Sequence, residues 1–276
     1  MLSTNEIDSY LAYLSQIRKY SPLTVLTYRE VLYEAADTVE SFDEDGKTVY
    51  NLKGYRGVIA KQSKKTIAKK VSVLRSFFEH KRDLGEKIKV LGDTQIKTPK
   101  TLPKPVNTEV IKKAIDLCED ITERLLIMLA YSAGLRISEL ENLSLDNLSG
   151  EWIRVEHGKG GKDRMVPILP EVKDILNIYL KTVKPVSYLF WDGTKRLSQN
   201  CLRYKITKIF QRVGYKVTPH QLRHSFATDL LNKGARITDV SELLGHKELA
   251  TTKIYTKLAQ SKKLDGYLGA HPLCKE

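Results

Sequence analysis

Three short segments in the C-terminal third carry the most informative pattern of this chain: Thr218-Pro219-His220-Gln221-Leu222-Arg223, then Leu244-Gly245-His246, then Tyr255 nine residues later. Thr218 and Pro219 predict the start of a helix, with the threonine as N-cap and the proline in the first turn. His220 and Arg223, three residues apart, then lie on one side of that helix, at the end where its dipole favours anions. The pattern predicts an anion site at a helix start.

Two further segments supply the remaining groups that phosphoryl chemistry requires. Arg136 lies in Ala133-Gly134-Leu135-Arg136-Ile137-Ser138-Glu139-Leu140, and Lys159 lies in Gly158-Lys159-Gly160. Two guanidiniums can each donate two hydrogen bonds to one phosphate. Imidazoles and an ammonium can transfer protons, and a phenol can attack phosphorus. The set therefore predicts transfer of a phosphate ester onto a protein side chain.

These strings, in this order and spread over about 120 residues, resemble the tyrosine recombinases, and most closely the Xer type. The resemblance rests on the Gly-Leu-Arg-x-Ser-Glu-Leu box, the Gly-Lys-Gly turn, the His-x-x-Arg pair and the tyrosine nine residues after Leu-Gly-His. It implies six catalytic residues: Arg136, Lys159, His220, Arg223, His246 and Tyr255.

The resemblance also implies a role for each residue. Tyr255 would attack a DNA phosphate and form a 3′-phosphotyrosyl link, with His220 as general base. Lys159 would protonate the departing 5′ oxygen, and Lys162 in the same turn is the second candidate for the general acid. The two arginines, with donors from the two histidines, would stabilise the transition state, so no metal, ATP or other cofactor is expected. Glu139 would brace the first arginine rather than react.

Each of these residues also has an ordinary structural interpretation. A His-x-x-Arg pair is common on helices, Arg136 could simply pair with Glu139, and lysines in glycine-rich turns are ordinary. The chain has 14 tyrosines, and most tyrosines pack half-buried with a satisfied hydroxyl. The order and spacing of the whole set favour the catalytic interpretation.

Charge points to the same class of partner. The chain has 276 residues, a formal net charge of +13 and a pI near 9.4. Residues 1–105 hold 19 basic and 13 acidic residues, so both halves of the chain are basic. This indicates a polyanion, nucleic acid before membrane, although basicity could also serve solubility alone.

Residues 1–98 predict a helical DNA-binding domain that resembles the SAM-like core-binding domain of the recombinases, including its Tyr20-Ser21-Pro22-Leu23-Thr24 opening. Apolar spacing predicts helices after Ser3 (with a Ser3–Glu6 capping box), from Pro22, over 52–61 and over 63–83, with an acidic loop at 41–51. A basic run without acids predicts a phosphate-facing surface. It comprises Lys61, Lys64, Lys65, Lys69, Lys70 and Arg75.

Residues 99–105 predict an interdomain linker, because Pro99, Pro103 and Pro105 exclude a helix. Residues 106–276 form the expected catalytic domain. Its helices are interrupted by two predicted strands, 152–156 and 164–168, joined by a glycine-rich hairpin that carries the Gly-Lys-Gly turn. The expected fold is mainly α with a small β-sheet, arranged as a two-domain DNA clamp.

The cysteine spacing and the apolar segments argue against disulfide-rich, zinc-binding, secreted and membrane-spanning proteins. Cys118, Cys201 and Cys274 are far apart and no Cys-x-x-Cys occurs, so neither a disulfide framework nor a zinc site is expected. The N-terminus lacks a signal-peptide pattern, and no apolar run is long enough to span a bilayer. We expect a cytoplasmic protein.

The resemblance implies partners as well. Recombination requires duplex DNA with a specific site and four protomers on two duplexes, as a homotetramer or a heterotetramer with a paralogue. Family members assemble by cyclic donation of the C-terminal segment, a head-to-tail contact that closes a ring. Here an apolar face could serve that purpose, or could instead pack within its own protomer: Leu258, Leu264, Tyr267 and Leu268. A septal DNA translocase is a further candidate partner.

Several functions fit this chemistry. Resolution of chromosome dimers at a dif-like site is favoured over a mobile-element integrase, because the two predicted domains leave no arm-binding domain at the N-terminus. A type IB topoisomerase fits the same residues less well, and a DNA-binding module without enzymatic activity would leave the catalytic set unused. One departure from the Xer pattern is Leu273, which stands where the tail usually continues with a basic residue.

Overall fold

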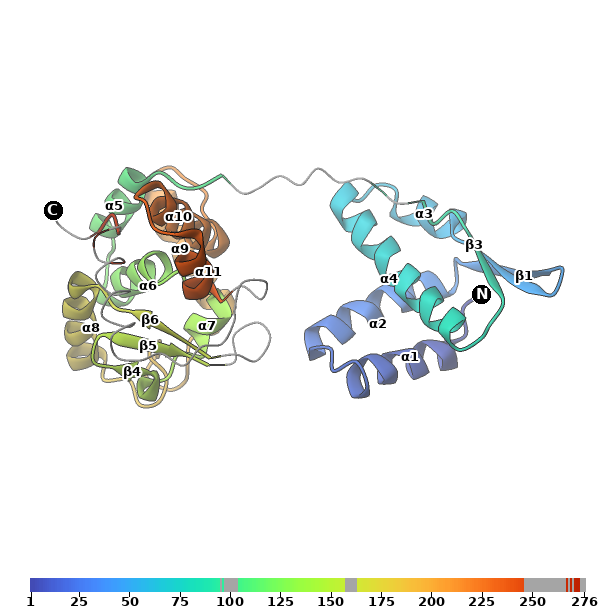
Figure 1. The fold of residues 1–276 in the computed structure, drawn as a ribbon, viewed down its shortest axis with the longest axis horizontal. Coiled ribbons are helices and arrows are strands. Elements are labelled where there is room, and N and C mark those ends of the chain that lie inside the picture. The colour runs from blue at the N-terminus through green and yellow to red at the C-terminus, as the bar shows by residue number, and fades with distance from the viewer. Residues whose placement is uncertain are drawn as a thin grey trace. The chain divides into compact units, whose positions relative to one another are not determined.

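The computed structural model describes residues 1–94, 96, 104–156, 163–245, 267, 269 and 271–273. The chain divides into two compact units, Met1–Thr101 and Leu102–Glu276, each with its own hydrophobic core (Figure 1). Both units are mainly helical and each contains a small three-stranded sheet, so the predicted fold class is confirmed. No described helix is long and apolar enough to cross a membrane.

Four helices build the first unit and follow the predicted apolar spacing. They are α1 (Thr4–Gln16), α2 (Pro22–Ala36), α3 (Lys53–Ile59) and α4 (Lys64–Asp83). The hydroxyls of Ser21 and Ser63 accept hydrogen bonds from backbone N–H groups in the first turns of α2 and α4. Ser3 is the N-cap of α1, but its side chain makes no cap hydrogen bond, so the predicted capping box is wrong.

The first unit also holds a sheet that replaces the loop expected at 41–51. Strand β1 (Glu40–Glu44) pairs antiparallel with β2 (Lys47–Asn51), and β2 pairs parallel with β3 (Ile88–Leu91). The turn between β1 and β2 places Asp45 and Gly46 at positive φ, 53° and 68°. This is the two-residue turn that suits the twist of a hairpin. The loop prediction is therefore wrong, because the acidic segment forms an exposed strand.

The second unit contains the predicted pair of strands and its connecting helices. Strand β5 (Trp152–Val155) pairs antiparallel with β4 (Leu148–Ser149) and with β6 (Arg164–Pro167). The helices are α5 (Thr108–Asp116), α6 (Ile121–Ser132), α7 (Ile137–Glu141), α8 (Pro170–Val183), α9 (Gln199–Arg212), α10 (Pro219–Asn232) and α11 (Ile237–Leu244), with a 3-10 turn at Leu145–Asn147.

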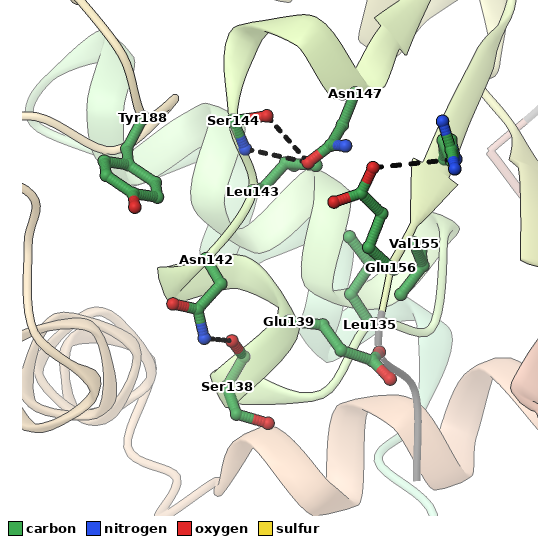
Figure 2. A pocket seen from close by; sticks show the side chains of 11 residues that line it. Leu135, Ser138, Glu139, Asn142, Leu143, Ser144, Asn147, Val155, Glu156 and Tyr188 are labelled. Carbon is green, nitrogen blue, oxygen red and sulfur yellow. Dashed lines mark hydrogen bonds and ion pairs between the residues drawn. The ribbon is translucent and has the colours of Figure 1, made fainter. Parts of the chain in front are cut away.

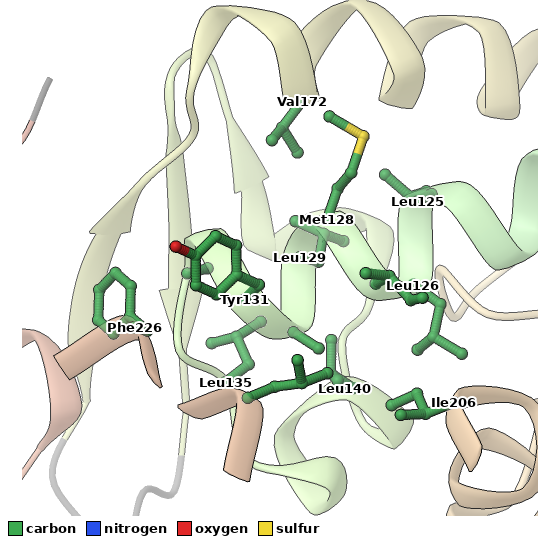
Figure 3. Packing of buried hydrophobic residues seen from close by; sticks show 14 of the residues in the cluster. Leu125, Leu126, Met128, Leu129, Tyr131, Leu135, Leu140, Val172, Ile206 and Phe226 are labelled. Atoms are coloured by element: carbon green, nitrogen blue, oxygen red, sulfur yellow. The ribbon is translucent and has the colours of Figure 1, made fainter. Parts of the chain in front are cut away.

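Helix α6 is the centre of the second core. It contacts α5, α8, α9 and α10, and its residues from Leu125 to Ser132 are all buried. Figure 3 shows Tyr131 and Leu129 of α6 among Val172, Ile206 and Phe226, which come from α8, α9 and α10. Other helices pack against α6 on several sides, so its C-terminal end is held in place. The segment that carries Arg136 follows directly from this end.

The described part of the C-terminal segment packs into its own unit. Tyr267 is 4% exposed and its hydroxyl donates to the Ser132 carbonyl. His271 is also 4% exposed and lies 5.3 Å from the Tyr131 ring, centroid to centroid. In the single chain Tyr267 thus follows the self-packing alternative, and donation of this segment to a neighbouring protomer stays a prediction. Leu258, Leu264 and Leu268 lie outside the described residues.

Candidate active site

Arg136 is positioned by a tight turn between α6 and α7. Gly134 has φ +57°, and a Cβ there would lie 2.5 Å from Cδ1 of Phe226 and 3.2 Å from Cδ2 of Leu244. Glycine is therefore required both for the backbone conformation and for the space. The turn leaves Arg136 as the N-cap of α7 with its side chain 25% exposed.

Glu139 in the first turn of α7 accepts hydrogen bonds from two arginines. Its Oε2 accepts from the Arg136 backbone N–H at 2.8 Å, and its Oε1 accepts from Arg136 Nη1 at 2.6 Å. Arg164 of β6 adds a two-pronged pair, Nη1 to Oε1 at 2.9 Å and Nη2 to Oε2 at 2.8 Å. Burial alone would raise the pKa of Glu139, but Arg164 and then Arg136 outweigh it and lower this pKa to about 2.

Arg223 of α10 approaches the same carboxylate. Its Nη1 lies 3.8 Å from Oε2 of Glu139 and donates to the Gly134 carbonyl at 2.5 Å. Its Nη2 donates to the Leu244 carbonyl at 2.5 Å. Burial, followed by the charge of Arg136, lowers the pKa of Arg223 to about 9, so the guanidinium stays cationic at neutral pH.

The two predicted phosphate-binding arginines therefore converge on one carboxylate. A guanidinium has five N–H donors, and the hydrogen bonds described here use one in the Arg136 side chain and two in Arg223. Donors on both residues remain for a phosphate. The buried carboxylate offsets part of the cation–cation repulsion, so the pair can be held ready before DNA arrives.

His220 occupies the first turn of α10, after Thr218 and Pro219 as predicted. The Thr218 hydroxyl accepts a hydrogen bond from the Gln221 backbone N–H at 3.3 Å. His220 is exposed, and among the described residues its side chain has no hydrogen-bond partner. It lies one helical turn from Arg223, at the positive end of the helix dipole, where an anion is favoured.

The other predicted catalytic residues lie outside the described residues: Lys159, the second candidate Lys162, His246 and Tyr255. Their flanking elements are described. The hairpin with both lysines leaves β5 and returns at β6, and the chain leaves α11 at Leu244 immediately before Gly245 and His246. The structure thus describes Arg136, His220 and Arg223 of the six, together with Glu139.

Comparisons with known proteins show the family of this chain. Residues 104–262 match the model of the phage integrase family, and residues 7–85 match that of the phage integrase N-terminal SAM-like domain. The chain belongs to the phage integrase family. Its curated relatives include tyrosine recombinase XerA of Pyrococcus horikoshii, 36% identical over 93% of this chain and 84% of the relative. Tyrosine recombinase XerC of Actinobacillus succinogenes is 34% identical over 98% of both chains.

Solved structures share the fold. A lambda integrase (residues 75–356) dimer bound to a core site has a TM-score of 0.72 and 17% identity, over 93% of this chain and all of that one. The XerH recombinase bound to its difH substrate has a TM-score of 0.64 and 23% identity, over 90% of this chain and 80% of that one. Together with the curated relatives, the family makes this chain a tyrosine recombinase of the Xer type, an enzyme of site-specific DNA recombination.

Arg164 is a site residue that the sequence pattern did not single out. It is 9% exposed, and its side chain contacts Glu139 and also donates from Nε to the Leu243 carbonyl at 2.7 Å. The signal was present in the strand pattern, because alternation in β6 places Arg164 on the same face as buried Val166. A charged residue on the inward face of a strand requires a buried partner.

A cleft of about 470 Å³ lies beside Glu139, between α7 and the end of β5 (Figure 2). Leu135 and Glu139 line it on one side and Val155 and Glu156 on another. Arg154 of β5 stands at the same cleft and donates to Asp163 at 2.9 Å across the base of the hairpin. The cleft therefore lies between the arginine box and the end of β5, the strand that leads to the candidate general acids.

The predicted DNA-facing basic residues of the first unit fall into two groups. Lys70 pairs with Glu34 at 2.5 Å, and Arg75 donates to the Asp93 carbonyl and lies 3.6 Å from its carboxylate. The sequence run had no acid of its own, but these acids come from α2 and from the segment after β3. Four lysines are exposed and have no ion pair among the described residues: Lys61, Lys64, Lys65 and Lys69. Their contact with DNA remains a prediction.

Proposed function

We propose that this recombinase cuts and rejoins duplex DNA through a 3′-phosphotyrosyl intermediate. The observation that carries the proposal is the convergence of Arg136 and Arg223 on Glu139, with His220 one turn from Arg223. This arrangement gathers cationic donors where a phosphate in reaction would gain charge. Membership of the phage integrase family supports the same chemistry.

The proposed reaction balances without an external energy source. The Tyr255 phenol transfers its proton to His220 and its oxygen bonds to phosphorus, while the bond from phosphorus to the 5′ oxygen breaks. Lys159 protonates that oxygen, and the 5′ hydroxyl departs. A 5′ hydroxyl from the partner duplex then attacks the phosphotyrosine and releases Tyr255. One ester replaces another at each step, so we propose that neither ATP nor a metal takes part.

We further propose that the substrate is a dif-like site and that the enzyme resolves chromosome dimers in the cytoplasm. Support comes from curated Xer relatives at 30–40% identity, and from a solved relative that is bound to a difH substrate. Four protomers on two duplexes would carry out the exchange, as a homotetramer or with a paralogue. A septal DNA translocase is the proposed activating partner.

The test uses covalent capture followed by a recombination assay. Purified protein is incubated with sheared DNA of the source genome, the trapped fragments are sequenced, and two differently marked duplexes carrying the recovered site are then mixed with protein. One chromosomal site and recombinant products are expected. Relaxation of supercoiled DNA without recombinants would indicate a topoisomerase instead, and capture only at the borders of a mobile element would indicate an integrase.

A further inference from the structure

Arg164 contacts the arginine box and the end of α11, the helix that leads to His246. It also lies just after the segment that carries Lys159 and Lys162. It grips both carboxylate oxygens of Glu139, which in turn holds Arg136. Its Nε donates to the Leu243 carbonyl in the last turn of α11. It is also the first residue of β6, two positions after Lys162.

The end of α11 depends on this contact. The last carbonyls of a helix have no partner within the helix. Here Arg164 donates to the Leu243 carbonyl in a part-buried setting, and Arg223 donates to the Leu244 carbonyl in a buried one. The next residue, Gly245, has φ +64°, and a Cβ there would lie 3.2 Å from Cδ of Arg164. The chain therefore passes directly over Arg164 as it leaves α11 for His246.

We propose that Arg164 is a positioning residue for DNA cleavage, which holds the start of β6, the arginine box and the end of α11 in one fixed arrangement. This inference rests on the proposed function. Arg164 differs from Arg223 in that all three of its side-chain nitrogens donate to protein acceptors, so we assign it to holding these groups rather than to binding the phosphate. It acts through the groups that it holds.

The geometry requires an arginine rather than any cation. A planar guanidinium can form two parallel hydrogen bonds to one carboxylate and a third in another direction, whereas a lysine ammonium is a point donor on a flexible stem. Displacement of catalytic groups by about 1 Å can cost on the order of 10²-fold in rate. Loss of the two parallel hydrogen bonds to Glu139 should therefore slow cleavage even in Arg164→Lys, which retains the positive charge.

The second unit offers a matched control. Arg212 of α9 forms the same kind of pair with Glu123 of α6, Nη1 at 2.6 Å and Nη2 at 3.1 Å, and also donates to the Leu117 carbonyl at 3.1 Å. It makes no hydrogen bond or ion pair with Arg136, His220 or Arg223, the proposed catalytic residues that the structure describes. Arg212→Met thus removes a bidentate arginine–glutamate pair with a similar loss of stability, and the comparison separates a stabilising role from a positioning role.

The experiment measures single-turnover formation of the covalent adduct on a nicked duplex carrying the captured genomic site, with protein in excess and well below each variant's melting temperature. DNA affinity is measured on the same duplex by fluorescence anisotropy. Arg164→Met and Arg164→Lys should both cleave about 10²-fold more slowly than wild type with affinity within about 3-fold. Arg212→Met should cleave at the wild-type rate. Arg164→Met combined with Glu139→Gln should slow cleavage by less than the product of the two single effects, because the two residues share one contact.

Two results would overturn the inference: equal cleavage rates for Arg164→Met and Arg212→Met, or a wild-type rate in Arg164→Lys, which would show that charge alone suffices. Arg164→Lys keeps the buried cation and so provides a folded variant if Arg164→Met does not fold. Failure of the proposed function itself looks different, because wild-type protein would then form no adduct.

Discussion

Glu139 is the residue on which the described part of the site depends. Its two carboxylate oxygens accept from Arg136 and Arg164, and Arg223 stands 3.8 Å away. Burial alone would raise the pKa of this carboxylate, but Arg164 and Arg136 favour its charged form more strongly, so the pKa is lowered. The same ion cluster therefore stabilises the fold and holds the arginines that are proposed to bind phosphate.

Glu139→Gln should destabilise the second unit in a pH-dependent way. Lowering the Glu139 pKa from its ordinary range to about 2 corresponds to about 3 kcal/mol of stability. Because the folded-state pKa is the lower one, this contribution is complete above about pH 5 and is lost as pH falls toward about 2. The difference in free energy of unfolding between wild type and Glu139→Gln, measured by urea denaturation, should shrink over this range. A difference that stays constant from pH 7 to 2.5 would contradict the charge assignment.

Gly134→Ala should be more damaging than the same change at Gly150. Both glycines have positive φ, +57° and +62°, so an alanine at either position costs about 1–2 kcal/mol of backbone strain. At Gly134 the new Cβ also meets Phe226, whereas at Gly150 nothing lies within 4 Å. The clash should add about 1–3 kcal/mol of destabilisation. Equal free energies of unfolding for the two variants would mean that the turn before Arg136 is not tightly packed.

At the scale of elements, sequence periodicity predicted the helices well. The cap at Ser21, the extent of α4 and the start of α10 at Thr218 and Pro219 are confirmed, because local spacing and capping chemistry determine them. The β1–β2 hairpin was missed because all of β1 is exposed, so it shows no alternation of buried and exposed residues. Its signal was Asp45-Gly46, the dipeptide that favours this turn.

Helix α4 allows a test of the DNA-facing surface. Replacing Lys65 or Lys69 with Gln should weaken binding to any duplex and lower the slope of log affinity against log salt by about 1 for each lost phosphate contact. Lys70→Gln is the matched control, since Lys70 is already paired with Glu34. Anisotropy titrations between about 50 and 200 mM salt measure both quantities. If Lys70→Gln weakened duplex binding as much as Lys65→Gln or Lys69→Gln, the assignment of Lys65 and Lys69 to the DNA-facing surface would be contradicted.

At the scale of the whole molecule, sequence spacing predicted a set of site residues but not the contacts between them. The interaction of Arg136 with Glu139 follows from local spacing, whereas Arg164 and the Leu243 carbonyl of α11 are 79 residues apart. Such contacts depend on tertiary packing, which no local pattern encodes. The same holds for Tyr267, whose apolar character did not indicate whether it serves its own unit or a neighbour's.

The central claim is that Tyr255 becomes covalently joined to a DNA 3′ end, and a nicked suicide substrate tests it most directly. The short 5′-hydroxyl fragment diffuses away, so wild-type protein should accumulate as an adduct whose digestion leaves DNA on the peptide containing Tyr255. Tyr255→Phe should bind the duplex equally well and form no adduct. An adduct that persists in Tyr255→Phe, or that maps to another tyrosine such as Tyr267, would contradict the assignment.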